Sequence, residues 1–326
     1  MLSSVYSAIV RRRRERYARR PDLRQRLHVP VISVGNLAVG GRGKTPMVAT
    51  IARELLRLGE RPAILTRGYK RTEPADGVVV VRDADGIRSD LGRAGDEPLM
   101  LARALPGACV LVCPDRYLAG RLAEQQFDVT VHVLDDGFQH LQLDRDIDIV
   151  MVGANDFARP VTLPAGRLRE PLDTLVAADA IVAADDDVVV APAAPDVPFF
   201  RTRRALAVPE RHAPAEENRV FAFAGIASPE RFFSDLTTAG YSVAGTRAFP
   251  DHHAYSRRDL DTLIAASRTA GADALVTTEK DLVRLLPYRP FRAAVHGVAL
   301  TMEPDPLPEF RQWLAGSVRA ARDIVD

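Results

Sequence analysis

Cysteine and long apolar runs are both scarce in this 326-residue chain. The two cysteines, Cys109 and Cys113, lie in the apolar run CVLVC, too far apart along a strand to bond each other. We therefore expect buried reduced thiols and no disulfide framework. No apolar run approaches the ~20 residues that a membrane helix needs. The opening MLSSVYSAIV precedes its charges and has no cleavage site, so it does not fit a secretory signal.

Lysine is rarer than the total of 44 basic residues suggests. Only Lys44, Lys70 and Lys280 are lysines, and all the others are arginine. A lysine kept against this bias is a candidate for a task that needs a compact point charge, which a guanidinium cannot supply. All three lie in motif-like stretches: GRGKTP, TRGYKR and TTEKD.

The chain also lacks a large net charge: basic and acidic residues nearly balance, and the formal net charge is +1. The molecule as a whole is therefore not a polyanion binder. Positive charge gathers between Arg11 and Arg26, where nine arginines face only Glu15 and Asp22. This run lacks the aromatic interleaving typical of nucleic-acid binding, and the rest of the chain is neutral or acidic. We expect no nucleic-acid partner.

What the chain does have is a globular composition, with 47% hydrophobic and 27% charged residues. Runs of Val, Ile and Leu alternate with helical patterns. Buried strands are expected at VPVISVG, RPAILTRG, ACVLVCP, VTVHVLDD and DIDIVMVG. Continuous apolar strands between helices indicate a parallel sheet covered on both faces.

The stretch GNLAVGGRGKTP follows one of these strands and opens a helix. Its glycines let backbone N–H groups turn toward phosphates, and the helix N-terminus adds partial positive charge. Lys44 would reach the β- and γ-phosphates, and Thr45 would hold Mg²⁺. Ala38 replaces the first glycine of the strict pattern, and a plain glycine turn is the alternative. The context favours a nucleotide site made of Gly40, Gly41, Arg42, Gly43, Lys44 and Thr45.

The fold class that we predict is α/β. The loop and its strands indicate a P-loop NTPase-type parallel sheet covered by helices. The rest of the chain adds a second, smaller α/β domain and an N-terminal amphipathic basic helix. We expect that helix and its connector at 1–28, the P-loop domain at 29–197, a linker at 198–218 and the C-terminal domain at 219–326. Proline, alanine and acidic residues mark the linker. The apolar face of the first helix is formed by Leu2, Val5, Tyr6, Ile9 and Val10.

Two acidic stretches are candidates for chemistry. VHVLDDGFQH is an apolar strand ending in Asp135 and Asp136, which either bind Mg²⁺ directly or through water, or merely turn the chain. The adjacent acids favour the metal role, without indicating which one contacts the ion. In AGDEPLM, Asp96 is either a helix cap or a carboxylate base near the γ-phosphate, with Glu97 supporting the metal shell.

FPDHHAYS places His252 and His253 in the second domain. No third ligand at zinc spacing accompanies them, so a metal site is disfavoured. They are either incidental loop residues or the source of a histidine that completes an acid–base pair.

In order along the chain, nine stretches resemble the tetraacyldisaccharide 4′-kinase family of lipid A biosynthesis. They span residues 31–285 and read VISVGNLAVGGRGKTP, LTRGYKR, GDEPLML, PDR, DDGFQHLQLDRDIDIV, LPAGRLREPL, FAGIASPERF, FPDHHAYS and LVTTEKDLVRL. In this family a small residue other than glycine is common at the position of Ala38. The resemblance implies transfer of the γ-phosphate of MgATP to the 4′-hydroxyl of tetraacyldisaccharide 1-phosphate, giving lipid IVA.

The resemblance also implies roles for residues that match the family motifs. The catalytic candidates are Lys44, Asp96, His252 and His253. The metal candidates are Thr45, Glu97, Asp135 and Asp136. Lys280 joins the loop as a nucleotide-binding candidate. The candidates for holding the acceptor's sugar or 1-phosphate are Arg67, Tyr69, Arg116, His140, Arg167 and Arg169.

The amino terminus departs from much of the family, in which a longer hydrophobic anchor is common. Here a short apolar face leads into RRRRERYARR, which suits a helix lying on anionic lipid. We expect peripheral attachment to the cytoplasmic face of the bacterial inner membrane and no obligate protein partner; a solvated basic helix is the alternative. Rival functions are a kinase of a soluble small molecule on the same fold and a nucleotide-dependent switch ATPase.

Overall fold

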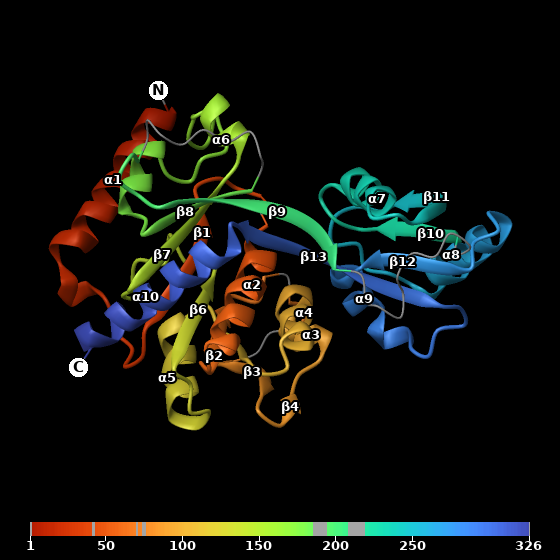
Figure 1. The fold of residues 1–326 in the computed structure, drawn as a ribbon, viewed down its shortest axis with the longest axis horizontal. Helices are drawn as coiled ribbons and strands as arrows, with labels where there is room; N and C mark the ends of the chain where they lie inside the picture. Colours follow the sequence, from red (N-terminus) through yellow and green to blue (C-terminus); the bar gives the residue numbers. More distant parts are fainter. Residues whose placement is uncertain are drawn as a thin grey trace. The chain divides into compact units, whose positions relative to one another are not determined.

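The computed structural model describes residues 2–40, 43–69, 71–73, 76–184, 194–207 and 219–325. The chain divides into two compact units (Figure 1). Unit 1 comprises Met1–Arg203 and Met302–Asp326, and unit 2 comprises Arg204–Thr301. The chain passes between the units within two strands, β9 (Phe199–Ala207) and β13 (Val295–Asp305). Strand β9 thus occupies the start of the segment expected to be a linker, and 208–218 lie outside the described residues.

The sheet of unit 1 has the strand order β9-β8-β7-β1-β6-β2-β5-β3-β4. Its strands are parallel except for β3, which pairs antiparallel with β5 and with β4. The bounds are β1 (Val31–Asn36), β2 (Pro62–Thr66), β3 (Val79–Asp83), β4 (Gly86–Ile87), β5 (Cys109–Val112), β6 (Val131–Asp135), β7 (Ile147–Val152) and β8 (Ala180–Ala183). Every residue of β1, β2, β5, β6 and β7 is buried, as expected of a parallel sheet covered on both faces.

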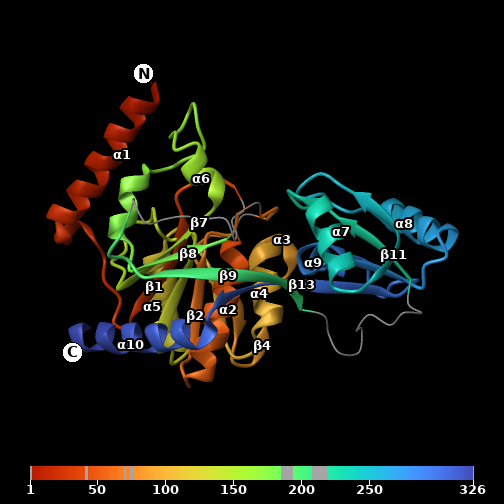
Figure 2. The ribbon, with the colours of Figure 1, turned by 45° about the horizontal axis from the view of Figure 1, so that its top comes forward.

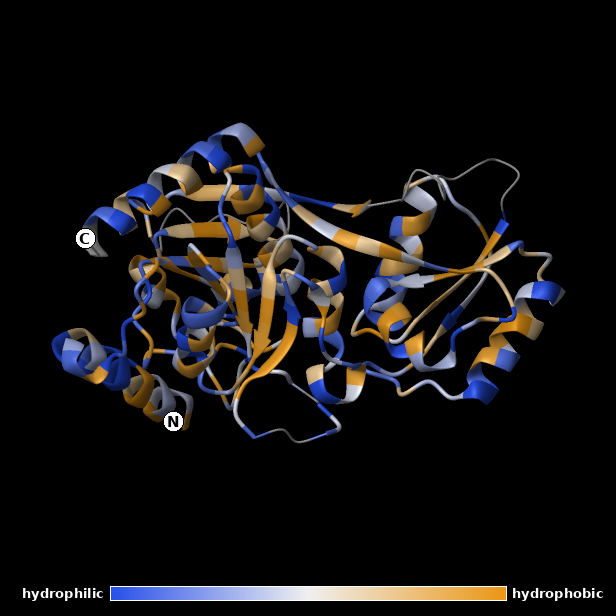
Figure 3. Cartoon of the chain, turned by 90° about the horizontal axis from the view of Figure 1, so that it is seen from below, coloured by the Kyte–Doolittle hydropathy of each residue, from blue (hydrophilic) through white to orange (hydrophobic). Residues whose placement is uncertain are grey.

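The helices of unit 1 surround this sheet (Figure 2). They are α1 (Leu2–Arg19), α2 (Lys44–Arg57), α3 (Leu91–Ala94), α4 (Asp96–Ala104), α5 (Arg116–Gln126), α6 (Ala154–Ala158) and α10 (Leu307–Val325), with 3₁₀ turns at Pro21–Leu23 and Leu172–Ala177. Helix α1 stands to one side of the sheet, where it contacts loop residues (Figure 2). Figure 3 shows the central strands as largely hydrophobic, whereas α1 and α10 mix hydrophilic and hydrophobic residues. The parallel α/β fold predicted from the alternating pattern is confirmed.

Helix α10 lies within unit 1, although its sequence position led us to expect it in the second domain. Phe310 is fully buried, and its ring stands edge-on to that of Phe200 with centroids 5.1 Å apart. Arg311 Nε lies 2.5 Å from Oε2 of the buried Glu54 of α2. These contacts explain why α10 belongs to unit 1: Phe310 is buried there, and both Phe310 and Trp313 pack against Phe200.

Unit 2 contains four parallel strands in the order β11-β10-β12-β13. Its other elements are β10 (Arg219–Ala224), α7 (Pro229–Thr238), β11 (Ser242–Ala248), α8 (Arg257–Thr269), β12 (Ala274–Thr278), α9 (Glu279–Leu285) and a 3₁₀ turn at Leu286–Tyr288. Phe232 and Leu236 of α7 pack in one buried cluster with β10. Leu260 and Leu263 of α8 pack in a second cluster, so both faces of the sheet are covered.

Helix α1 presents two different faces. Leu2, Val5 and Ile9 are 73%, 54% and 62% exposed, whereas Tyr6 is half-buried and its hydroxyl donates to the Arg169 carbonyl at 3.2 Å. The single apolar face expected from the sequence is therefore divided, because the tyrosine turns toward the protein. Among the described residues, no helix is both long and apolar enough to cross a membrane.

Candidate functional site

The loop between β1 and α2 has the backbone that its glycines predict. Gly43 caps α2 with a left-handed φ of 75°, which a residue with a side chain adopts only with strain. Gly40 has a φ of 107°, and a Cβ there would stand 2.7 Å from Arg167 Nη2. Glycine is needed at both positions. The other two loop candidates, Gly41 and Arg42, lie outside the described residues.

Lys44 and Thr45 meet the acid pair at the end of β6. Lys44 Nζ donates to Asn36 Oδ1 at 3.1 Å and lies 3.4 Å from Asp136 Oδ1. Thr45 Oγ1 donates to Asp135 Oδ2 at 3.4 Å. The meeting follows from topology, because β1 and β6 are adjacent parallel strands whose carboxyl ends share an edge.

The two adjacent carboxylates have different electrostatic environments. Burial and the negative charge of Glu97 raise the pKa of Asp135 to about 7, although Lys44 opposes the shift. For Asp136, burial alone would raise the pKa, but hydrogen bonds from Arg169 and the charge of Lys44 outweigh it and lower the pKa to about 2. Asp136 therefore carries a full negative charge at neutral pH, and Asp135 shares its environment with other acids.

Arg169 holds Asp136 directly. Its Nη1 and Nη2 atoms donate to the two carboxylate oxygens at 2.9 and 2.7 Å, and Nη2 also donates to the carbonyl and side-chain oxygens of Asn36. The neighbouring Arg167 donates to the Val39 carbonyl at 2.9 Å. From the sequence, both arginines were predicted at the acceptor; in the structure they contact the phosphate loop and its acid.

Asp96 opens α4 without being its cap. Gly95 occupies the cap position, and Asp96 Oδ1 accepts a 2.9 Å hydrogen bond from the Glu97 backbone N–H. The Asp96 side chain is buried, with 7% of the residue exposed. Because the charge of Glu97 acts on Asp135, the start of α4 lies in the electrostatic neighbourhood of the acid pair.

Three further candidates follow strands at the same edge of the sheet: Arg67 after β2, Arg116 after β5 and His140 after β6. Burial and the charge of Arg67 lower the pKa of Arg116, which is 4% exposed. Burial and the charges of Arg116 and Arg145 lower the pKa of His140 to about 4. A neutral imidazole and two guanidiniums at one sheet edge suit an anionic ligand. The remaining candidate, Tyr69, is 65% exposed.

The histidine pair lies in unit 2, where the two rings have different roles. His253 Nε2 lies 3.3 Å from Asp259 Oδ2, and its ring stacks on Phe249 at 4.6 Å. His252 has a φ of 61°, and its ring nitrogens lie 3.4 Å from Lys280 Nζ and from Arg284 Nη2. The structure thus brings His252 and Lys280 together, as two candidates that the sequence could not join.

Sequence reasoning missed the residues that organise this group. Asp281 is fully buried and accepts hydrogen bonds from Tyr255 Oη at 3.0 Å, the Gly225 N–H at 3.1 Å and Arg284 Nη1 at 2.8 Å. The only available signal was its place three residues after Thr278, which caps α9. Asn36 was also missed, because the only sequence signal for it is its position at the end of β1.

Comparison with known proteins gives consistent matches across the chain. The family model described as tetraacyldisaccharide-1-P 4′-kinase matches residues 1–319. A tetraacyldisaccharide 4′-kinase of Geobacter metallireducens is 41% identical over 321 residues, covering 94% of each chain. One of Koribacter versatilis is 40% identical over 309 residues, covering 93% of each. The crystal structure of LpxK from Aquifex aeolicus in complex with ATP matches with a TM-score of 0.81 at 31% identity and 97% coverage of both chains.

Proposed function

Because the chain belongs to the tetraacyldisaccharide-1-P 4′-kinase family, we propose that it transfers the γ-phosphate of ATP to the 4′-hydroxyl of tetraacyldisaccharide 1-phosphate. The product is lipid IVA, in lipid A biosynthesis. The observation that carries the proposal is the phosphate loop whose Lys44 and Thr45 contact the acid pair of β6.

The loop supplies the site for ATP. Its backbone and the N-terminus of α2 carry the positive partial charges that bind phosphates. Lys44 is held by Asn36 and Asp136, and it exchanges these partners for the β- and γ-phosphates when the nucleotide binds. Catalysis in this class is positioning and charge neutralisation, for which a compact cation is suited.

The residues present fit Mg²⁺. Among the described residues no group of three or more His, Cys, Asp or Glu side chains gathers as a metal centre. Magnesium bound with a nucleotide needs fewer protein ligands, because phosphate oxygens and water complete its octahedron. Thr45 Oγ1 and Asp135 Oδ2, 3.4 Å apart, would hold it, with Asp136 and Glu97 nearby. Once bound, the ion neutralises charge on the transferred phosphoryl group.

Asp96 acts as the general base. Its carboxylate takes the proton of the 4′-hydroxyl as that oxygen attacks the γ-phosphorus and ADP leaves. The hydrogen bond from the Glu97 N–H fixes one of its oxygens. The histidine candidates for assisting this step, His252 and His253, belong to unit 2, where His252 Nε2 lies 3.4 Å from Lys280 Nζ.

The acceptor is held by the cationic group at the strand ends. Arg67 and Arg116 contribute charge, and His140, neutral at physiological pH, contributes hydrogen bonds to a sugar. Arg167, Arg169 and Tyr69 complete the proposed acceptor site. These residue types suit a phosphorylated sugar better than the acyl chains that it carries.

Helix α1 attaches the enzyme to the cytoplasmic surface of the inner membrane. An exposed stripe runs along it in steps of three and four residues: Leu2, Val5, Ile9, Arg12, Arg16 and Arg19. Apolar side chains enter the interface at one end of the stripe, and arginines meet anionic headgroups at the other. Each such cation contributes about 1 kcal/mol.

Transfer of labelled γ-phosphate in mixed micelles tests the proposal. The purified protein with MgATP and tetraacyldisaccharide 1-phosphate should yield a bisphosphorylated lipid whose new phosphate is on the 4′-oxygen. A deacylated glucosamine disaccharide serves as the comparison acceptor, because a kinase of soluble sugars would phosphorylate it equally well. ATP hydrolysis without any phosphorylated product would instead favour a switch ATPase and contradict the proposal.

A further inference from the structure

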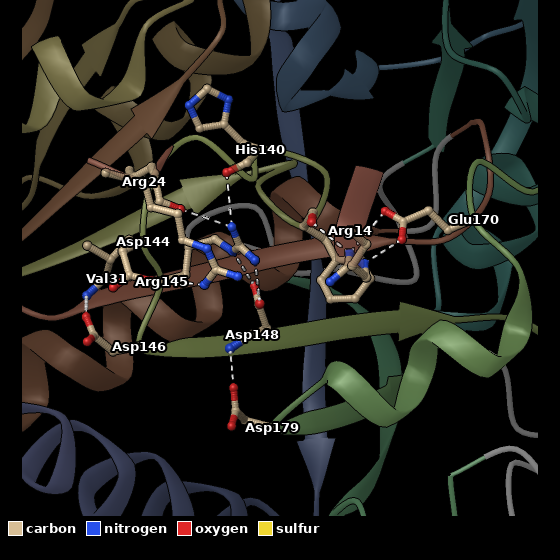
Figure 4. Close-up of polar contacts among 12 residues, drawn as sticks. Arg14, Arg24, Val31, His140, Asp144, Arg145, Asp146, Asp148, Glu170 and Asp179 are labelled. Carbon is tan, nitrogen blue, oxygen red and sulfur yellow. Dashed lines mark hydrogen bonds and ion pairs between the residues drawn. The ribbon is translucent and has the colours of Figure 1, made fainter. Parts of the chain in front are cut away.

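The loop after β6 is held from two sides by arginines (Figure 4). It carries Asp136 and His140. On one side, Arg145 Nη1 donates to the carbonyls of His140 and Leu143, both at 3.0 Å, and its guanidinium pairs with Asp148 at 2.9 Å. The contact on the other side comes from α1, more than a hundred residues away in sequence.

Arg14 provides that second contact. Its Nη2 donates to the Phe138 carbonyl at 3.2 Å, and its guanidinium lies over the Phe138 ring, 4.3 Å from the centroid. The same guanidinium makes two hydrogen bonds to Glu170, Nε at 2.8 Å and Nη2 at 3.1 Å. Glu170 is 2% exposed, so this is a desolvated ion pair with a fixed geometry.

Both partners of Arg14, Phe138 and Glu170, are close in sequence to residues that position the Asp136 carboxylate. Phe138 stands two residues after Asp136, and Glu170 directly follows Arg169, whose guanidinium holds Asp136. Arg14 therefore joins the segment that carries the acid to the segment that carries its clamp.

The rest of the inward face of α1 touches the same segments. Tyr6 Oη donates to the Arg169 carbonyl at 3.2 Å, and Arg13 Nη1 donates to the Gln139 carbonyl at 3.3 Å. Gln139 Nε2 donates in turn to the Asn36 carbonyl at 3.0 Å, at the start of the phosphate loop. One face of α1 thus contacts backbone around the site, and the other carries the exposed stripe.

We propose that Arg14 is a positioning residue for phosphoryl transfer: with Glu170 it fixes Asp136 and Arg169 relative to Lys44, and so makes turnover depend on how α1 is seated. The inference rests on the proposed roles of the loop and the acid pair. A displacement of about 1 Å in a catalytic constellation costs on the order of a hundredfold in rate. Loss of Arg14 should lower kcat, and its effect on acceptor affinity, through Arg169, should be smaller.

The full-length protein in mixed micelles supplies the test, with Arg14→Gln and Glu170→Gln compared with Arg11→Gln. Arg11 is the matched control, because it also joins α1 to a nearby acid, Asp173 at 2.5 Å, but both partners are exposed. We expect kcat to fall at least about tenfold in the two buried-pair variants and to stay within about twofold in the control.

A double variant separates positioning from folding. Either single change leaves a buried group without its charge partner and lowers the melting temperature, whereas Arg14→Gln with Glu170→Gln removes both charges and should recover stability. The proposal expects kcat to remain low in that double variant. Recovery of kcat together with stability, or a folded Arg14→Gln variant with normal kcat, would overturn it. Absence of transfer by the unmodified protein would instead refute the proposed function and the inference with it.

Discussion

Asp135 and Asp136 are adjacent in sequence, yet their carboxylates lie in opposite electrostatic environments. Burial and nearby acids raise the pKa of Asp135 to about 7, and the Arg169 hydrogen bonds together with Lys44 lower the pKa of Asp136 to about 2. The sequence indicated an acid pair without distinguishing its members. Contacts from Arg169 and Lys44, which come from other segments, create the difference.

The candidate side chains stand in local motifs, whereas the residues that support them do not. Lys44, Thr45 and the acid pair stand in local motifs that can be read from the chain, and the structure joins them. Arg14 and Glu170 are 156 positions apart and belong to no shared motif. Such contacts depend on tertiary packing, so local spacing cannot reveal them.

At His140 we predict a pH-dependent contribution to stability. Its pKa falls from 6.5 in the unfolded chain to about 4 when folded, because burial and the charges of Arg116 and Arg145 disfavour the imidazolium. The contribution is complete above pH 6.5 and declines as the pH falls toward 4, where unfolded chains bind more protons. The decline is at most about 3 kcal/mol.

Urea unfolding of the wild type and His140→Gln between pH 4 and 7 measures this contribution. The difference in unfolding free energy between the two proteins should change with pH across this window. A difference that is constant over the whole window would contradict the assigned environment.

At Asp96 we predict a loss of turnover with nucleotide binding preserved. Asp96→Asn keeps an oxygen that can accept from the Glu97 N–H but cannot take the acceptor's proton. The kcat should fall by about 10²–10⁴-fold, with the dissociation constant for MgATP within about twofold of wild type. If kcat were nearly normal across the pH range, the base role would have to be abandoned.

At the scale of elements, α10 shows where sequence order misleads. It follows unit 2 along the chain, but its contacts with Glu54 and Phe200 belong to unit 1. Alternating strands and helices can be recognised from hydrophobic periodicity, whereas the sheet that a terminal helix joins depends on complementary side chains. Most strands of the first sheet were predicted; the membership of this helix was not.

Phe310→Ala should therefore destabilise unit 1. Phe310 is fully buried against Phe200 and Trp313, and removing such a ring costs about 3–5 kcal/mol. Chemical denaturation measures the loss. Leu118→Ala is the control, because that side chain is 47% exposed and its removal should cost no more than about 0.5 kcal/mol. Equal effects of the two changes would contradict the assigned packing of α10.

The exposed stripe of α1 gives a prediction about attachment. Replacing Val5 and Ile9 by Gln should weaken binding to vesicles that contain anionic lipid, because both side chains are more than half exposed and available to the interface. The melting temperature should not change. Sedimentation with vesicles measures binding, and unchanged binding would indicate that α1 is a solvated basic helix.

At the scale of the whole molecule, the ordered motifs predicted the family, and the matches over residues 1–319 confirm it. This prediction succeeded because the nine motifs extend over most of the chain, so their order adds specificity that no single motif has. The division into units was harder to anticipate, since β9 and β13 pass between them without a break in secondary structure.

We propose that the phosphate loop drives phosphoryl transfer through a compact lysine cation. The most direct measurement is the single-turnover rate of γ-phosphate transfer to the lipid acceptor in wild type, Lys44→Ala and Lys44→Arg. Both variants should fold and lose at least about 10²-fold in rate, since a guanidinium cannot replace the point charge. Transfer by Lys44→Ala at a rate near that of wild type would show that Lys44 is not needed for the reaction.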